Sequence, residues 1–73
     1  MPDIDDEILV RVNGDELAIA AGQSVAALLA RLGLDTRKVA VERNLAIVPR
    51  SQYGSTLLTA GDALEIVHFI GGG

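Results

Sequence analysis

The sequence predicts an α+β fold, a mixed sheet of four or five strands with one main helix packed on one face. Segments rich in β-branched residues begin and end the chain, an amphipathic segment lies between them, and turn-forming residues separate the segments. The expected order is strand, strand, helix, strand, strand, strand. Such an order gives a single sheet whose apolar face is covered by the helix.

The first two strands are predicted over residues 8–12 and 16–19, joined by Asn13-Gly14. Residues 8–12 are rich in β-branched side chains, and residues 16–19 return the chain after the turn. Asn-Gly tolerates the positive φ angles of a type I′ turn and is a strong signal for a short hairpin. The domain therefore opens with an antiparallel pair.

The helix is predicted over residues 24–32. Ser24 can accept a hydrogen bond from a backbone N–H of the first turn, and Gly33 can end the helix in the left-handed conformation. The larger apolar residues between them recur at i, i+3, i+4 and i+7, so they share one helix face: Val25, Leu28, Leu29 and Leu32.

Three further strands are predicted, near residues 39–42, 46–48 and 63–70, with the short one beginning at about Leu45 and ending before Pro49. Arg43-Asn44 has the composition of a turn, and residues 51–56 indicate a loop with a 3₁₀ turn. In the last strand alternate side chains face opposite sides, and we assign Leu64 and Ile66 to the core face.

Composition excludes several classes of function. The chain has 73 residues, one His and no Cys, so we expect one domain with an aliphatic core, no disulfide and no metal site. Its six basic residues are scattered and its net charge is −4, so we expect no nucleic-acid binding. The longest apolar runs have five or six residues, too short for a membrane span. We expect a cytoplasmic monomer.

The predicted organisation is a flexible acidic leader over residues 1–7, a domain over residues 8–70 and a flexible glycine tail over residues 71–73. Three consecutive glycines pay a large entropic cost in a strand and have no side chains. Such a tail can enter a narrow channel of another protein. The group that it delivers there is the α-carboxylate of Gly73.

The chain resembles the ThiS family of thiamine-biosynthesis sulfur carriers from about residue 8 to residue 73. The residues that carry the resemblance are Ala21–Val25, Val41–Asn44, Ile47–Arg50, Tyr53 and Gly61–Gly73. The resemblance implies a ubiquitin-like β-grasp fold with the first and last strands adjacent and parallel.

The resemblance also implies a function. A ThiF-like (E1-like) adenylating enzyme would use ATP and Mg to activate the Gly73 carboxylate, with Gly71 and Gly72 entering the partner's channel. A sulfur donor protein would then convert the acyl-adenylate to a thiocarboxylate, and a ThiG-like thiazole synthase would consume the sulfur. The chain itself would bind no cofactor, have no catalytic residue and act as a substrate of these enzymes.

Three other functions are compatible with the same tail. One is that of a MoaD-like small subunit of molybdopterin synthase, the second that of a ubiquitin-like protein modifier, and the third that of a binding module with an inert tail. The acceptor that takes the sulfur, or the covalent adduct that forms, would distinguish them.

Val67, Phe69 and Ile70 form the candidate partner surface. Val67 and Phe69 fall on the strand face opposite Leu64, so they are either exposed or covered by the loop over residues 50–59. Both arrangements are open at this point.

Four polar or aromatic residues are candidates of lower rank. We interpret His68 as an exposed strand residue rather than a proton donor, because no acidic residue beside it suggests a catalytic pair. We expect Arg50 and Tyr53 to anchor their loop rather than to contact partners, and Asp62 to be a turn residue.

Overall fold

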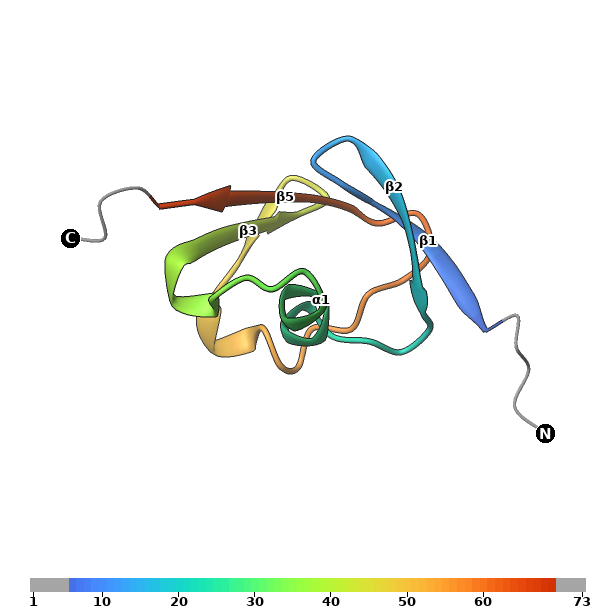
Figure 1. The fold of residues 1–73 in the computed structure, drawn as a ribbon, viewed down its shortest axis with the longest axis horizontal. Helices are drawn as coiled ribbons and strands as arrows, with labels where there is room; N and C mark the ends of the chain where they lie inside the picture. The colour runs from blue at the N-terminus through green and yellow to red at the C-terminus, as the bar shows by residue number, and fades with distance from the viewer. Residues whose placement is uncertain (1–5, 70–73) are drawn as a thin grey trace.

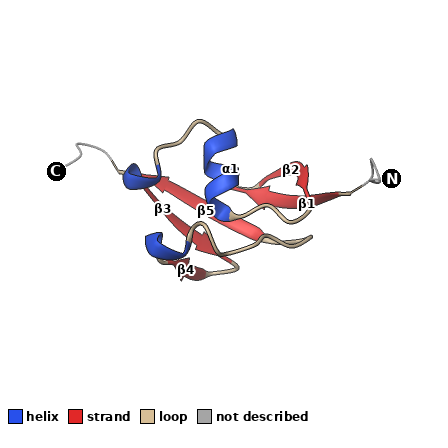
Figure 2. Cartoon of the chain, turned by 90° about the horizontal axis from the view of Figure 1, so that it is seen from below, coloured by secondary structure: helices blue, strands red, loops and turns tan. Residues whose placement is uncertain are grey.

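Five strands form one mixed sheet in the order β2-β1-β5-β3-β4 in the computed structural model, which describes residues 6–69. A single α-helix, α1, lies across one face of this sheet (Figures 1 and 2). The elements are β1 (Glu7–Val12), β2 (Asp15–Ala20), α1 (Val25–Arg31), β3 (Val39–Arg43), β4 (Ala46–Val48) and β5 (Ala63–His68). The predicted fold class and order of elements are confirmed.

The first and last strands lie side by side at the centre of the sheet. β1 pairs with β5 in parallel, with Arg11 opposite Ala63 and Val12 opposite Leu64. β1 also pairs with β2, and β3 pairs with both β5 and β4, all antiparallel. The parallel pairing predicted from the family resemblance is therefore confirmed, and β4 is the edge strand expected before Pro49.

The helix begins and ends one residue inside its predicted bounds. Ser24 stays extended and its hydroxyl accepts a hydrogen bond from the backbone N–H of Ala27 at 3.1 Å, as expected of an N-cap. Leu32 is the C-cap and Gly33 follows with φ of +73°. Leu32, which the periodicity placed on the buried helix face, is 39% exposed.

The core lies between α1 and the inner face of the sheet. The strands contribute Val10, Ile19, Val39, Val41, Val48 and Leu64, the helix contributes Val25, Leu28 and Leu29, and the loop before β5 contributes Tyr53 and Leu58. Leu64 is 1% exposed, and Ile66 packs against this cluster while partly buried. The core is aliphatic apart from Tyr53, as the composition predicts.

The turn between β3 and β4 differs from the prediction. Leu45, which the sequence places at the start of the strand, lies in the turn with φ of +71°, directly after Asn44 with φ of +52°. Two consecutive positive φ angles define a type I′ turn, the short connection whose twist matches an antiparallel pair. The geometry of the hairpin overrides the apolar character of Leu45, which is 92% exposed.

Two short 3₁₀ segments lie in the connections before β3 and after β4. η2 (Arg50–Gln52) corresponds to the 3₁₀ turn expected in this loop and begins one residue earlier. η1 (Thr36–Lys38) was not predicted, and it begins where the carboxylate of Asp35 accepts a hydrogen bond from the backbone N–H of Arg37 at 2.9 Å.

Candidate functional site

β5 leads the chain toward the predicted sulfur-carrying glycines. Ile70, Gly71, Gly72 and Gly73 lie outside the described residues, and Phe69 is the last described residue before them. The ladder between β5 and β3 extends to that residue, because the backbone N–H of Phe69 donates to the carbonyl of Lys38 at 2.8 Å. The base of the predicted tail is therefore held in the sheet.

The structure decides that the apolar residues at the end of β5 are exposed. Val67 is 58% exposed and Phe69 is 51% exposed. The loop that could have covered them packs on the other side of the sheet, where Tyr53 and Leu58 join the core. There the backbone N–H of Ala26 donates to the carbonyl of Tyr53, and the backbone N–H of Leu58 donates to the carbonyl of Gln23. That loop therefore closes the helix side and leaves the opposite face open.

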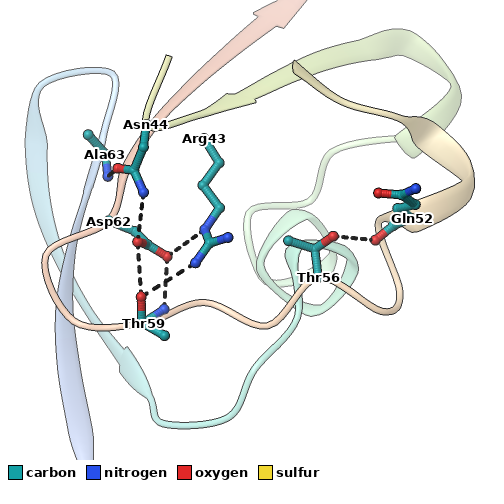
Figure 3. Close-up of polar contacts among 7 residues, drawn as sticks. All are labelled: Arg43, Asn44, Gln52, Thr56, Thr59, Asp62 and Ala63. Atoms are coloured by element: carbon teal, nitrogen blue, oxygen red, sulfur yellow. Dashed lines mark hydrogen bonds and ion pairs between the residues drawn. The ribbon is translucent and has the colours of Figure 1, made fainter. Parts of the chain in front are cut away.

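Tyr53 and Arg50 hold this loop in place, as expected. The hydroxyl of Tyr53 is buried and donates to the carbonyl of Val39 at 3.3 Å. The guanidinium of Arg50 donates to the carbonyl of Arg37, also at 3.3 Å. Thr56 closes the loop from within by donating its hydroxyl hydrogen to the carbonyl of Gln52 at 2.8 Å (Figure 3).

Asp62 is more than a turn residue, because its side chain is the centre of a buried polar network (Figure 3). One oxygen, Oδ2, accepts from Arg43 Nε and from the backbone N–H of Thr59, both at 2.8 Å. The other, Oδ1, accepts from Asn44 Nδ2 and from the Thr59 hydroxyl, both at 3.0 Å. The network joins the β3–β4 turn to the start of β5.

These donors also decide the charge of Asp62. Burial by itself raises the pKa of this carboxyl, since it penalises the charged form. The hydrogen bonds from the Thr59 backbone, the Arg43 guanidinium, the Asn44 amide and the Thr59 hydroxyl act in the other direction and outweigh burial, so the pKa of Asp62 lies below its usual 3.8.

Two turn asparagines clamp β5 from its two sides. Asn13 in the β1–β2 turn accepts from the backbone N–H of Ile66 at 2.7 Å and donates to the carbonyl of Ile66 at 3.2 Å. Asn44 in the β3–β4 turn accepts from the backbone N–H of Ala63 at 2.9 Å. Sequence reasoning predicted both turns but not these contacts, because no local pattern relates either turn to a strand so far along the chain.

His68 is exposed and lines an open cavity of about 330 Å³ beside Leu32, Leu34 and Ile66.

Among residues 6–69, His, Asp and Glu side chains do not gather in any group of three that could hold a metal ion. None of the helices formed by these residues has the length and apolar content that a membrane crossing requires.

Comparison with known proteins identifies the family. The model of the ThiS family matches residues 7–73. The chain belongs to the ThiS family. The sulfur carrier protein ThiS of Bacillus subtilis is 46% identical over 46 residues, which cover 63% of this chain and 70% of the relative.

Solved structures agree with this ThiS assignment. The crystal structure of a thiamine biosynthesis protein (ThiS) from Geobacter metallireducens superposes with a TM-score of 0.78 at 32% identity. The match covers 90% of this chain and all of that protein. The ubiquitin-like β-grasp fold implied by the family resemblance is therefore confirmed.

Two further relatives are longer proteins. A thiazole synthase of Paramagnetospirillum magneticum is 58% identical over 62 residues, and one of Magnetococcus marinus is 47% identical over 64 residues. These matches cover 85% and 88% of this chain but 19% and 20% of the two relatives. The chain thus spans about a fifth of the length of these curated relatives.

Proposed function

We propose that this ThiS-family chain is a sulfur carrier for thiazole formation in thiamine biosynthesis, with the α-carboxylate of Gly73 as the carrying group. The observation that carries the proposal is the family match, which runs from residue 7 through the three glycines to residue 73. The relative from Bacillus subtilis that bears the name sulfur carrier protein ThiS supports the same function.

The proposed chemistry begins with activation of the carboxylate. A carboxylate oxygen of Gly73 attacks the α-phosphate of ATP in an adenylating partner, pyrophosphate leaves, and an acyl-adenylate forms. A sulfur nucleophile at the oxidation level of hydrosulfide then attacks the acyl carbon, and AMP leaves with the bridging oxygen. The product is a thiocarboxylate, and no electrons are gained or lost. Because these steps use ATP, we place the carrier in the cytoplasm.

In this proposal the folded domain positions the tail and supplies no catalytic group. The chain reaches the reaction only through its tail, so the enzymes supply the catalytic groups and this protein acts as their substrate. The clamps on Ile66 and Ala63 and the bond from Phe69 to Lys38 hold β5 in one place. A rigid base reduces the entropy that the partner must remove to place the carboxylate.

We propose two enzyme partners. The first is a ThiF-like adenylating enzyme, which the chemistry of a carboxylate carrier requires. The second is a ThiG-like thiazole synthase. It is supported by the relatives named thiazole synthase, in which a segment similar to this chain makes up about a fifth of the protein. A carrier and its acceptor enzyme benefit from a shared chain, because tethering raises their effective concentration.

The test is the intact mass of the protein after incubation with a ThiF-like enzyme, Mg·ATP and sulfide. We expect a gain equal to the difference between one sulfur and one oxygen atom. The thiolated product should then lose this mass to a thiazole synthase and not to the large subunit of molybdopterin synthase. Transfer to the latter alone would contradict the thiamine assignment, and no gain of mass would contradict the carrier function.

A further inference from the structure

The second half of β5 has a neighbouring strand on one side only. In the described chain β1 pairs with β5 as far as Val12, opposite Leu64, and then turns away into the hairpin with β2. β5 runs on past the tip of that hairpin toward the end of the described chain (Figure 1). On the other side β3 stays alongside, as far as the pair of Val39 with His68. The strand that leads to the predicted carrying glycines therefore loses one of its two neighbours.

The side chain of Asn13 takes the place of the missing strand. The backbone groups of successive strand residues point to opposite sides, and the N–H of Phe69 points to β3, so those of Ile66 point away from β3. Asn13 Oδ1 accepts from the N–H of Ile66 at 2.7 Å, and Asn13 Nδ2 donates to its carbonyl at 3.2 Å. A side-chain amide carries the same kind of donor and acceptor as a peptide group. Asn13 thus pairs with Ile66 as a residue of a neighbouring strand would.

Packing beneath this half of β5 is loose. Leu64 is 1% exposed, whereas Ile66 is only partly buried and His68 is exposed. Ile66 and His68 both border the open cavity of about 330 Å³, which Asn13 also lines. Side chains that border open space lack contact atoms on that side. The direction of β5 beyond Leu64 therefore depends on hydrogen bonds more than on the core.

The residues that follow cannot supply a direction of their own. Residues 71–73 are all glycine, and glycine accepts a wider range of backbone angles than any other residue. The direction in which the terminal carboxylate leaves the domain is therefore set by the residues of β5 that the sheet holds.

We propose that Asn13 is a positioning residue for thiolation, which acts through Ile66 to fix the direction in which β5 presents the Gly73 carboxylate to the adenylating enzyme. This inference rests on the proposed function. Without Asn13 this half of β5 is held from the β3 side alone and can swing away from it. Fewer enzyme-bound molecules then hold the carboxylate in attack geometry, where a displacement of about 1 Å already matters.

The decisive variant is Asn13→Gly. Asn13 has φ of +51° and Gly14 has φ of +89°, and Gly-Gly is a favoured pair for such a type I′ turn. The substitution therefore keeps the hairpin and removes the side-chain amide. We expect the rate of thiolation at saturating enzyme to fall roughly three- to tenfold, while KM stays within about twofold of the parent. A raised KM at the parental saturation rate would make Asn13 a contact of the enzyme and overturn the positioning role.

Hydrogen exchange shows whether the tie itself has been lost. The amide of Ile66 should lose most of its protection in Asn13→Gly, because its acceptor is gone. The amide of Val67 faces β3 and should keep its protection. Equal loss at both amides would mean that the whole strand has loosened, which would contradict a local tie.

Ser24→Ala is the control for stability. It removes the hydrogen bond that caps α1 and should lower the unfolding temperature by about a few degrees, as Asn13→Gly should. Ser24 does not contact β5, so we expect thiolation of Ser24→Ala at the parental rate. Equal slowing of both variants would show that lower stability, and not the direction of β5, is the cause.

Asn13→Asp provides a conservative rescue. Aspartate tolerates positive φ and keeps an acceptor for the N–H of Ile66, although it cannot donate to the carbonyl. Protection of the Ile66 amide and the saturation rate should both lie between those of Asn13→Gly and the parent. A rate that does not follow this protection across the three proteins would overturn the proposal.

The same assay separates this inference from the proposed function. If the parent is thiolated and Asn13→Gly matches its rate, the positioning role fails while the carrier function stands. If the parent is not thiolated at any enzyme concentration, the carrier function itself fails.

Discussion

Single residues with two structural roles hold this small domain together. Asn13 and Asn44 each adopt the positive φ that a type I′ turn needs, and each also bonds to the backbone of β5. Leu45 also adopts a positive φ, but its apolar side chain cannot form a hydrogen bond to β5 in exchange. The left-handed region costs a non-glycine residue about 1–2 kcal/mol. The positive φ is thus accompanied by a hydrogen bond to β5 at the two asparagines, while Leu45 adopts it without one.

Asp62 provides a stability prediction at this scale. Asp62→Asn removes a charge and replaces one accepting oxygen with a donor that faces Arg43 or Asn44. We expect a loss of about 2–3 kcal/mol in the free energy of unfolding, the usual range for hydrogen bonds to a buried charge. Denaturant titration at neutral pH measures it. Asp35→Asn, which breaks an exposed pair with Arg37, should change stability little and serves as the control.

The pH dependence follows from the direction of the pKa shift. Since the pKa of Asp62 is lower in the folded protein than its usual 3.8, the unfolded chain takes up the proton first. The stabilisation is therefore present above the unfolded pKa and is lost as the pH falls through the folded pKa. The difference in stability between the parent and Asp62→Asn should shrink below about pH 4. A constant difference down to pH 2 would show that charge is not the cause.

The proposed function depends on a single residue, Gly73. Deleting it withdraws the terminal carboxylate by about 3.5 Å, and a displacement of about 1 Å already harms attack geometry. We expect the deletion, and also the addition of one residue after Gly73, to abolish thiolation measured by intact mass. Both variants should unfold at the temperature of the parent. Thiolation at the parental rate in both would exclude this carboxylate as the working group.

At the scale of elements, β5 combines two different surfaces in one strand. Its inward side chain Leu64 is 1% exposed, while Val67 is 58% exposed. The alternation of a strand separates buried from exposed side chains within a few residues. The same element therefore stabilises the domain and presents an exposed apolar surface.

This division predicts opposite results for two aspartate substitutions. Leu64→Asp places a charge in the core and should cost more than about 4 kcal/mol, enough to unfold much of the protein. Phe69→Asp changes a half-exposed side chain and should cost less than about 1 kcal/mol, yet it should weaken binding to the adenylating enzyme. Thermal unfolding and calorimetric titration measure the two effects. A drop in unfolding temperature for Phe69→Asp as large as that for Leu64→Asp would show that Phe69 is part of a core.

At the scale of the whole molecule, stability is concentrated at the centre of the sheet. The order β2-β1-β5-β3-β4 places β5 between β1 and β3, and α1 covers the same central strands on one face (Figure 2). β4 is short and pairs on one side only, with β3. β4, which contributes one residue, Val48, to the core, is therefore expected to open before the central strands.

Hydrogen exchange tests this arrangement. Amides of β5 that bond within the ladder, such as those of Glu65 and Val67, should exchange only on global unfolding, and amides of β4 should exchange through local opening with a lower free energy. Amide-resolved exchange by NMR gives these free energies. Equal protection of β4 and β5 would indicate that the sheet opens only as a whole.

Local patterns along the chain were sufficient to predict the elements and the family. Alternation, helical periodicity, Ser24 as a cap and Asn-Gly as a turn are local signals, and they led to strands and a helix within about two residues of their observed bounds. The terminal glycines and the residues resembling the ThiS family pointed to the function that the family match supports. Local propensity fails where a short turn demands positive φ, as at Leu45, and it did not indicate the 3₁₀ segment η1.

Which surfaces are open and which polar groups are paired depends on how distant segments pack together. The sequence left Val67 and Phe69 between core and surface, because the choice depends on the side of the sheet on which the Tyr53 loop packs. Asp62 looked like an ordinary turn residue, because its partners Arg43 and Asn44 are 19 and 18 residues away. The bond between Asn13 and Ile66 likewise exists only once the register of β1 and β5 is set. Contacts between distant segments form when the core closes, and no local pattern encodes them.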